Sequence, residues 1–287
     1  MGKILLSDKE RINTVYIISK GRPRCTTART LTRIGYPGEW FIVCGNNDET
    51  LDEYKANWGD RVIVFDWYEE IKHTDTLDNF GFEIKASGAC PVRNVVARIS
   101  RERGEERHWQ FDDDYNKFAA IKNINGRLRN RRLLGKELER WLLCIAKFGD
   151  KAKLPNVGFG PALIESAPEN WRKMKQRIFN AHNMINDENI RTEWVSRLND
   201  DLINAINTWK SGKPEFSSHF ASMTMETTQA EAGGLSDMYK QDGTVRKTAY
   251  SVMVCPSAVK LTINLGRYHH KVDWRRITPM ILHEKWS

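Results

Sequence analysis

An apolar run followed by a polar, glycine-containing turn occurs twice in the first third of the chain. The first pair is Val15–Ser19 with Lys20–Arg29, and the second is Trp40–Cys44 with Gly45–Asp48. A helical stretch and a third apolar run, Arg61–Asp66, follow. Strands at these places with helices between them predict an α/β fold with a mostly parallel sheet. Ligands bind at the carboxyl ends of such strands, so the first turn predicts a nucleotide site where N–H groups and basic side chains face an anion.

Three consecutive aspartates, Asp112, Asp113 and Asp114, follow the short apolar run His108–Phe111. Side chains alternate along an extended strand, so Asp112 and Asp114 are expected on the same face. Two aligned carboxylates repel each other unless a divalent cation binds them, and such oxygen ligands suit Mg²⁺ or Mn²⁺ with positions left open for a diphosphate. The same residues also fit an ordinary acidic turn after a strand.

A helix is predicted from Pro91 to Ile99, because its valine and isoleucine side chains share one helical face and proline is tolerated in a first turn. Arg93 and Asn94 lie near the amino end of this helix, where exposed N–H groups favour an anionic ligand. Spacing alone fits ordinary solvated residues equally well.

The segment Lys122–Arg132 is rich in arginine, contains Gly126 and has no periodic apolar face. We predict a mobile loop here, either solvated or in contact with phosphate groups. An amphipathic helix with an apolar stripe from Leu134 to Phe148 follows. Two further strands are predicted at 157–164 and 177–185.

A later helix starts at Asn199-Asp200-Asp201, has an apolar face and ends at Gly212. Either Asp200 or Asp201 can simply cap this helix, a role worth about 1 kcal/mol. Beyond the helix we predict a sheet-like tail with strands at 216–225, 245–255, 260–265 and 267–276.

The charge of the chain favours a polyanionic partner. Its formal net charge is +8, and between Arg246 and Lys285 eight Lys or Arg residues stand against two acidic ones. Tyr250, Tyr268 and Trp274 are interleaved with these cations. Such a segment can follow a phosphate backbone and offer rings to an extruded base. The same composition fits a basic solvated sheet with aromatic residues in the core.

Composition also limits the class of protein. With 40% hydrophobic and 10% aromatic residues the chain can bury a core, whereas its apolar runs are too short to span a bilayer. The first residues lack the apolar segment of a signal peptide, and five cysteines without a close pair fit neither a disulfide framework nor a zinc site. We expect a globular, cytoplasmic protein with reduced thiols and no membrane partner.

Three motifs occur in an order that resembles the nucleotide-sugar glycosyltransferases of the GT-A fold. They are the turn Ser19–Pro23, the Arg93-Asn94 helix that leads into Phe111–Asp114, and the helix start Asn199–Asp201. The resemblance covers about residues 14–220. It implies a Rossmann-like, mostly parallel sheet flanked by helices with a β-rich carboxyl-terminal extension, a UDP-sugar as donor, and Mn²⁺ or Mg²⁺ as cofactor.

In that family the first turn holds the nucleobase, and the Arg-Asn pair precedes the Asp-x-Asp motif. The residues that this implies for donor binding are Ser19, Gly21, Arg22, Arg93, Asn94, Asp112 and Asp113. Asp112 and Asp114 are the expected metal ligands. A late histidine is often a further ligand in this family, and the candidates are His219, His269 and His270, although a single histidine in a strand is more often structural.

The later acidic motif of the family supplies the base for the acceptor hydroxyl. Counting back from Gly212 puts Asp201 at that position, with Asp200 as the second candidate. Direct displacement with such a base inverts the anomeric centre, while the sequence leaves retention open. The sequence departs from the family pattern at two places. An acidic residue at the end of the second strand usually contacts the uracil, and here only Asp48 follows a little later. The acceptor motif has Asp200 where glutamate is usual.

The last part of the chain looks like the phage-encoded TET-associated glycosyltransferases, which are believed to glycosylate 5-hydroxymethylpyrimidines in phage DNA. The similar features are Gly233-Gly234, Asp242–Thr244, Lys247, Met253–Pro256, Val259-Lys260 and Arg267–Trp274. The resemblance implies sugar transfer to 5-hydroxymethylcytosine, or another 5-hydroxymethylpyrimidine, in double-stranded DNA within the host cytoplasm. We expect a catalytic domain at 1–225 and a basic DNA-contacting extension at 226–287.

Three alternatives remain open at this point. A GT-A enzyme with a saccharide acceptor would transfer sugar to a glycan without any need for DNA. A catalytically inert nucleic-acid-binding protein would be unaffected by the change Asp114→Ala. A nucleotidyltransferase would use paired aspartates and two metal ions to consume a nucleoside triphosphate.

Overall fold

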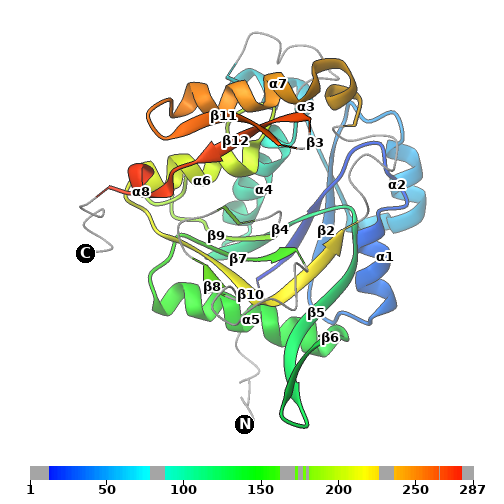
Figure 1. Ribbon diagram of the computed structural model, residues 1–287. Coiled ribbons are helices and arrows are strands. Elements are labelled where there is room, and N and C mark those ends of the chain that lie inside the picture. The colour runs from blue at the N-terminus through cyan, green and yellow to red at the C-terminus, as the bar shows by residue number, and fades with distance from the viewer. Residues whose placement is uncertain are drawn as a thin grey trace.

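The structure is a computed structural model that describes residues 13–77, 88–161, 172–173, 177–178, 181–225, 236–264 and 266–279. One large sheet crosses the molecule, and helices lie around it (Figure 1). The strand order is β3-β2-β1-β4-β9-β7-β10-β5-β6, with β8 paired to β10. This arrangement confirms the expected α/β fold.

The first four strands form the parallel half of the sheet. β1 pairs with β2 and β4, and β2 pairs with β3, each in parallel. The strands predicted near positions 15, 40 and 62 are therefore confirmed. Their bounds are β1 Val15–Ile18, β2 Trp40–Gly45, β3 Val62–Phe65 and β4 Arg107–Asp112.

The second half of the sheet is mixed. β9 is antiparallel to both β4 and β7, while β10 is parallel to β7 and antiparallel to β5. The strands predicted at 157–164 and 177–185 are found as the shorter β7 and β9, and residues 162–164 lie outside the described part. The bounds are β5 Tyr115–Ile124, β6 Arg127–Arg132, β7 Asn156–Pro161, β8 Arg172–Lys173, β9 Ala181–Ile185 and β10 Glu215–Met225.

The helices bury both faces of the sheet, and β1 shows how. Val15 and Ile17 lie in one core with Leu31 and Leu142. Tyr16 and Ile18 point to the other face and lie in a second core with residues of α3 and α4. No helix of the described residues is long and apolar enough to cross a membrane. The helices of the main body are α1 Thr26–Arg33, α2 Leu51–Trp58, η1 Gly59–Arg61, α3 Trp67–His73, α4 Cys90–Glu102, α5 Gly135–Lys151 and α6 Asp200–Lys210.

The prediction of a mobile loop at Lys122–Arg132 was wrong, because the segment forms most of a β-hairpin. β5 and β6 pair in antiparallel register from Ala119↔Arg132 to Ile124↔Arg127. Asn125 and Gly126 form the two-residue turn with φ of +51° and +77°. An Asn-Gly pair with both φ values positive is the preferred hairpin connection, and this local signal outweighs the missing apolar alternation.

The prediction of a strand at 245–255 was also wrong, because these residues belong to helix α7, Ser236–Val254. Thr248 and Ser251 of this helix are buried three residues apart, as one helix face requires. The last two predicted strands are found as β11 Val259–Asn264 and β12 Arg267–Val272, which form a separate two-stranded sheet. The prediction was wrong for residues 274–276, which belong to helix α8, Trp274–Ile277.

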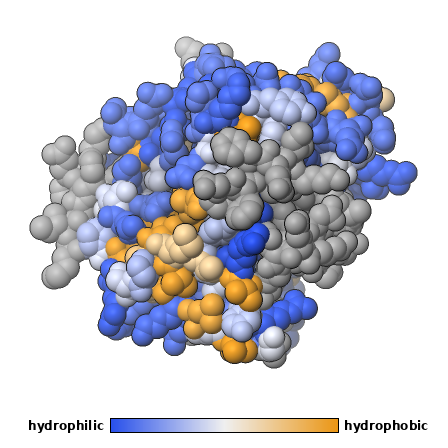
Figure 2. All heavy atoms as spheres, turned by 90° about the horizontal axis from the view of Figure 1, so that it is seen from above, coloured by the Kyte–Doolittle hydropathy of each residue, from blue (hydrophilic) through white to orange (hydrophobic). Residues whose placement is uncertain are grey.

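The carboxyl-terminal elements pack on α6. Leu202, Ile206 and Trp209 of α6 share a core with Cys255 and Ile277. Figure 2 looks onto the side of the molecule where these elements lie in Figure 1, and shows hydrophilic residues around an apolar patch. The division at residue 225 stays a prediction, because residues 226–235 lie outside the described part.

Smaller expectations had mixed outcomes. All five cysteines are free, and all but Cys144 are buried, in agreement with reduced core thiols. The amphipathic helix α5 is confirmed, but the two ends of its expected stripe, Leu134 and Phe148, are 62% and 44% exposed.

Candidate active site

The turn after β1 is held in shape by residues of the next β–α unit. Gly21 has a φ of +68°, which favours glycine, and its N–H donates to Asp48 Oδ2 at 2.8 Å. The N–H of Arg22 donates to the Tyr54 hydroxyl at 2.9 Å, and Ser19 Oγ lies 2.6 Å from that hydroxyl. Asp48, which the sequence offers for the nucleobase, therefore shapes the turn.

Asp113 joins this turn to the end of β4. Ser19 Oγ donates to Asp113 Oδ2 at 2.6 Å, and Arg22 donates to Asp113 Oδ1 at 2.8 Å. Burial raises the pKa of Asp113, while Arg22 and Ser19 oppose the rise by stabilising its charged form. Three of the residues predicted for donor binding thus meet at one point.

Arg93 is the central cation of the site. It is only 3% exposed, and its Nε donates to Asp200 Oδ2 at 2.8 Å while a terminal nitrogen donates to Asp112 Oδ1 at 2.9 Å. Its guanidinium carbon lies 4.6 Å from the centroid of the Trp194 ring. The alternative of an ordinary solvated arginine is therefore wrong. Arg93 joins the Asp-x-Asp motif to the helix proposed to bear the base.

Asn94 binds the backbone of Trp194 through its side-chain amide. Its amide donates to the carbonyl of Trp194 at 2.9 Å and accepts from the N–H of Trp194 at 2.9 Å. These two hydrogen bonds fix the backbone of Trp194, whose indole ring lies against Arg93. Both the nitrogen and the oxygen of the Asn94 amide take part in these bonds to Trp194. Donor binding by Asn94 stays a prediction.

The aspartate triplet lies at a corner. β4 ends at Asp112, and Asp113 and Asp114 form the turn before β5, so strand alternation does not extend to Asp114. Thr27 of α1 fixes the corner, since its hydroxyl donates to the Asp112 carbonyl at 2.6 Å and accepts from the Tyr115 N–H at 2.8 Å.

Negative charge is crowded around Asp112. Its side chain is 24% exposed, and its pKa is raised to about 8, because burial and the nearby carboxylates of Asp114 and Asp200 outweigh the opposing effect of Arg93. A divalent cation relieves this kind of repulsion. Among the described residues no group of three or more His, Cys, Asp or Glu side chains is placed to hold a metal. Mg²⁺ and Mn²⁺ usually take one or two carboxylates and complete their shell with phosphates and water, which Asp112 and Asp114 fit.

The two aspartates at the start of α6 differ in their surroundings. Burial and the neighbouring carboxylate of Asp201 raise the pKa of Asp200 despite its ion pair with Arg93. For Asp201 burial acts in the same direction, but Arg177, 3.0 Å away, and the N–H of Leu202 outweigh it and lower the pKa. Asp201 is thus an ionised carboxylate at neutral pH. Asn199, not an aspartate, is the residue before the helix, and its side chain makes no cap.

Two of the histidine candidates, His269 and His270, lie on β12, and the side chain of the third lies outside the described part. His270 of β12 has its Nδ1 3.4 Å from Asn199 Nδ2. Its pKa is lowered to about 4 by burial and by the charges of Arg177 and Lys247, so it is neutral. His269 is exposed, and the side chain of His219 is not among those described. Metal binding by His219, His269 or His270 stays a prediction.

Arg177 had no sequence signal, and Lys247 stood only among the features of the carboxyl-terminal resemblance, without a role. Arg177 and Lys247 both act on the charge of Asp201, and burial lowers the pKa of Lys247. Asn199 donates to the Lys247 carbonyl at 2.9 Å, which ties α7 to the start of α6. These residues are far apart along the chain, and only the fold brings them together.

A row of buried, hydrogen-bonded polar side chains ends next to the ring of Trp194. Asn156 Nδ2 donates to Glu215 Oε1 at 2.8 Å and lies 3.3 Å from His182 Nδ1, and the His182 ring is 4.8 Å from that of Trp194. Burial raises the pKa of Glu215 to about 8, although the bond from Asn156 opposes the rise. Glu215 is therefore protonated at neutral pH.

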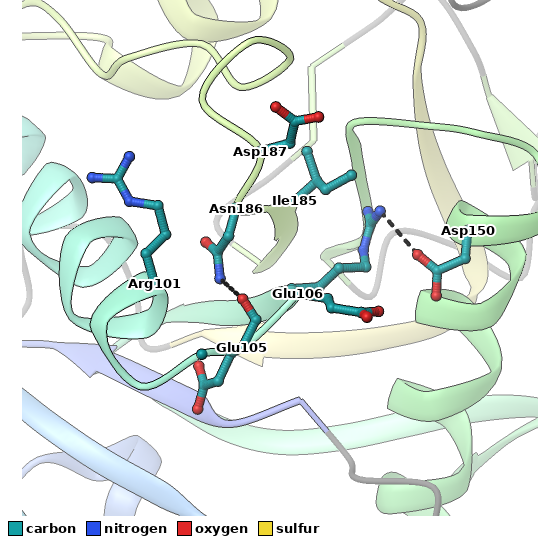
Figure 3. Close-up of a pocket in the computed structure, with 9 residues that line it drawn as sticks. Arg101, Glu105, Glu106, Asp150, Ile185, Asn186 and Asp187 are labelled. Carbon is teal, nitrogen blue, oxygen red and sulfur yellow. Dashed lines mark hydrogen bonds and ion pairs between the residues drawn. The ribbon is translucent and has the colours of Figure 1, made fainter.

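Two surface hollows lie away from the aspartates. One, of about 450 Å³, is at the opposite end of β4, where Arg107 reaches Asp150 at 3.3 Å and Asn186 donates to the Glu105 carbonyl (Figure 3). The other, of about 410 Å³, is lined by Arg24, Arg29, Asn57 and Trp58 beside the first turn.

The fold and the site together define an α/β protein of the GT-A type, with a glycine-containing turn after β1 and an acidic motif at the end of β4. The chain belongs to the TET-associated glycosyltransferase family, whose model matches residues 13–234. This finding confirms the resemblance predicted from the motifs, and the family is one of glycosyltransferases. No curated protein matches the chain significantly.

Proposed function

We propose that this protein transfers a sugar from a UDP-sugar to the hydroxymethyl group of a 5-hydroxymethylpyrimidine in double-stranded phage DNA. The base that we propose is 5-hydroxymethylcytosine. The observation that carries the proposal is the bridge made by Arg93, which contacts Asp112 at 2.9 Å and Asp200 at 2.8 Å. A transferase needs its donor and acceptor groups held at a fixed separation, and one buried guanidinium joins the two elements here.

On the donor side, the turn Ser19–Arg22 is proposed to receive the uridine, with the diphosphate toward Asp112 and Asp114. One terminal nitrogen of Arg93 is buried and has no hydrogen-bond partner among the described residues, so it is a donor for which a phosphate oxygen would be a partner. Mn²⁺ or Mg²⁺ bound by Asp112 and Asp114 would act as a Lewis acid that neutralises charge on the departing diphosphate.

On the acceptor side, Asp201 is proposed to receive the proton. The hydroxymethyl oxygen forms a bond to the anomeric carbon while the bond from that carbon to the diphosphate breaks, and the hydroxyl proton passes to a carboxylate oxygen of Asp201. An ionised aspartate in hydrogen-bond reach contributes about 10²–10⁴-fold to such a step. Attack from the face opposite the diphosphate inverts the anomeric centre. Asp200 is the second candidate, and each of the two carboxylates has an ion pair, Asp200 with Arg93 and Asp201 with Arg177.

The DNA acceptor is supported by charge and by the family. The chain carries a net charge of +8, and the elements that follow α6 bring Lys247 next to Asp201. We place the protein in the host cytoplasm, where phage DNA is modified.

Mass spectrometry of a hydroxymethylated duplex tests the proposal, after incubation with Mn²⁺ and each of a panel of nucleotide sugars. We expect a gain of one sugar per hydroxymethyl group, with none on the unmodified duplex. Sugar transfer to a glycan with no product on the duplex would overturn the DNA acceptor. Transfer to neither, with turnover of a nucleoside triphosphate, would overturn the reaction class.

A further inference from the structure

A row of exposed arginines leads from the first turn to the far end of the β5–β6 hairpin. Arg24 lies just before α1, Arg29 and Arg33 lie on α1, and Arg127, Arg129, Arg131 and Arg132 lie on β6. None of the four arginines on β6 has a carboxylate partner among the described residues. From Tyr115 to Arg132 the chain holds six Lys or Arg and no Asp or Glu.

The two parts of the row are joined in space. Arg33, at the end of α1, donates to the carbonyl of Asn116 at the start of β5 at 2.8 Å. The hairpin leaves the body of the protein just beyond this point, where the Leu133 N–H bonds to the Phe118 carbonyl, and it projects away from α7 and β12 (Figure 1). At about 1.5 Å per helical residue and 3.4 Å per strand residue, the row is about 30 Å long, or about nine base pairs of DNA.

The hairpin carries a repulsion that a polyanion would relieve. Arg129 lies directly opposite Lys122 in the ladder, and like charges at such positions are destabilising. Lys122 has Glu137 of α5 as a partner, while Arg129 has none among the described residues. β6 is an edge strand, and charge of either sign prevents such an edge from pairing with another sheet. Edge protection therefore does not account for a surface with cations alone.

The spacing fits the DNA backbone. Arg127, Arg129 and Arg131 alternate along β6, so they repeat at about 6.8 Å. A duplex presents one phosphate per strand for about every 3.4 Å of its axis, so each of these guanidinium groups has a phosphate within reach. Arg24 and Arg29 of the row also line the hollow beside the first turn, together with Asn57 and Trp58, so an amide lies next to these two cations.

We propose that the arginine row of α1 and the β5–β6 hairpin binds the phosphate backbone of the duplex that flanks the modified base. This inference rests on the proposed function and adds a second contact surface to the one formed by α7, β11 and β12. The hairpin raises the affinity for DNA and takes no part in the transfer of the sugar.

The test compares two triple variants with equal loss of charge. Arg127, Arg129 and Arg131 are changed to Gln in the first, and Lys55, Lys72 and Arg98, which lie on α2, α3 and α4, are changed to Gln in the second. Both are checked by circular dichroism and thermal unfolding. Binding of a 30-base-pair duplex is measured by fluorescence anisotropy between 50 and 200 mM salt.

We expect the hairpin variant to bind the duplex about tenfold or more weakly, with its log–log salt slope reduced by about 2 to 3, while the control variant changes little. The KM of the hairpin variant for the long duplex should rise, and its kcat at a saturating concentration of that duplex should equal that of the unaltered protein.

Equal binding by the two variants, with sugar transfer intact, would overturn the inference and leave the proposed function standing. Hairpin-dependent binding to phosphatidylserine vesicles that exceeds binding to the duplex would also overturn it, in favour of a membrane surface. An unaltered protein that transfers no sugar to any hydroxymethylated DNA would overturn the proposed function itself.

Discussion

Two regions of this protein use arginine in opposite ways. At the centre of the site Arg93 is 3% exposed and contacts two carboxylates and an indole. On the β5–β6 hairpin four arginines are exposed, with no ion pair among the described residues. A buried guanidinium fixes the separation of the groups that it joins, whereas an exposed one keeps its hydration and acts at a distance. The comparison separates the part that positions reactants from the part proposed to attract DNA.

The largest effect is expected from Arg93→Ala. The change leaves Asp112 and Asp200 buried without their shared cation, which should lower the free energy of unfolding by about 3–5 kcal/mol and abolish transfer. Arg93→Lys should not restore activity, since an ammonium does not reproduce two directed bonds. Urea unfolding and a transfer assay measure both effects.

Arg98→Ala is the matched control, because Arg98 lies on the same helix, is 46% exposed and pairs with Glu70. Its loss should change the free energy of unfolding by no more than about 1 kcal/mol. Equal destabilisation by the two changes would break the contrast between the buried and exposed arginines.

Asp201→Asn comes next. Removal of the proposed base should lower kcat by about 10²–10⁴-fold with little change in the KM for the UDP-sugar, because the proposed donor contacts lie at the carboxyl ends of β1 and β4. Steady-state kinetics with both substrates varied gives the measurement. A normal kcat for this variant, with kcat lost in Asp200→Asn, would move the base to Asp200.

A third prediction concerns pH and the buried Glu215. Its pKa is raised to about 8 in the folded protein, so the folded state keeps this proton where the unfolded chain releases it. Its contribution to stability is therefore greatest below about pH 4.3 and is lost as the pH rises to about 8, by an amount on the order of a few kcal/mol.

Glu215→Gln should remove this decline, which urea unfolding at pH 5, 6.5 and 8 would show as a smaller loss of stability than in the unaltered protein. Glu102→Gln serves as a surface control, since Glu102 is 67% exposed. The same pH dependence in all three proteins would mean that Glu215 does not hold the proton.

The smallest effect is expected at the tip of the hairpin. Gly126 has a φ of +77°, so Gly126→Ala should cost about 1 kcal/mol through backbone strain and loosen the hairpin. Gly104→Ala is a close match, because Gly104 has a φ of +71° and both positions leave open space for a Cβ. Only the change at Gly126 should weaken binding to a long duplex.

The sequence predicted what local patterns encode. Apolar runs gave β1, β2 and β3, and the order of motifs led to the residues that meet at Arg93 and Asp113. The hairpin and α7 were missed, because an Asn-Gly turn was given less weight than a run of arginines, and a helix with buried threonine and serine was taken for a strand.

Other parts of the site depend on contacts between distant residues. Arg177 and Lys247 influence Asp201 only because the segment before β9 and helix α7 both lie near the start of α6, and Asn94 binds the backbone of a residue 100 positions away. A pattern of single residues contains no record of such pairs, so the charge state of each aspartate could be derived only from the folded chain.

Isothermal titration of UDP, with and without Mn²⁺, tests most directly whether the end of β4 is the donor site. The unaltered protein and Asp201→Asn should bind UDP with equal affinity in a manner that requires Mn²⁺, and Asp112→Asn with Asp114→Asn should abolish that binding while the protein stays folded. Binding of UDP that is unchanged in the Asp112→Asn, Asp114→Asn variant would contradict the account.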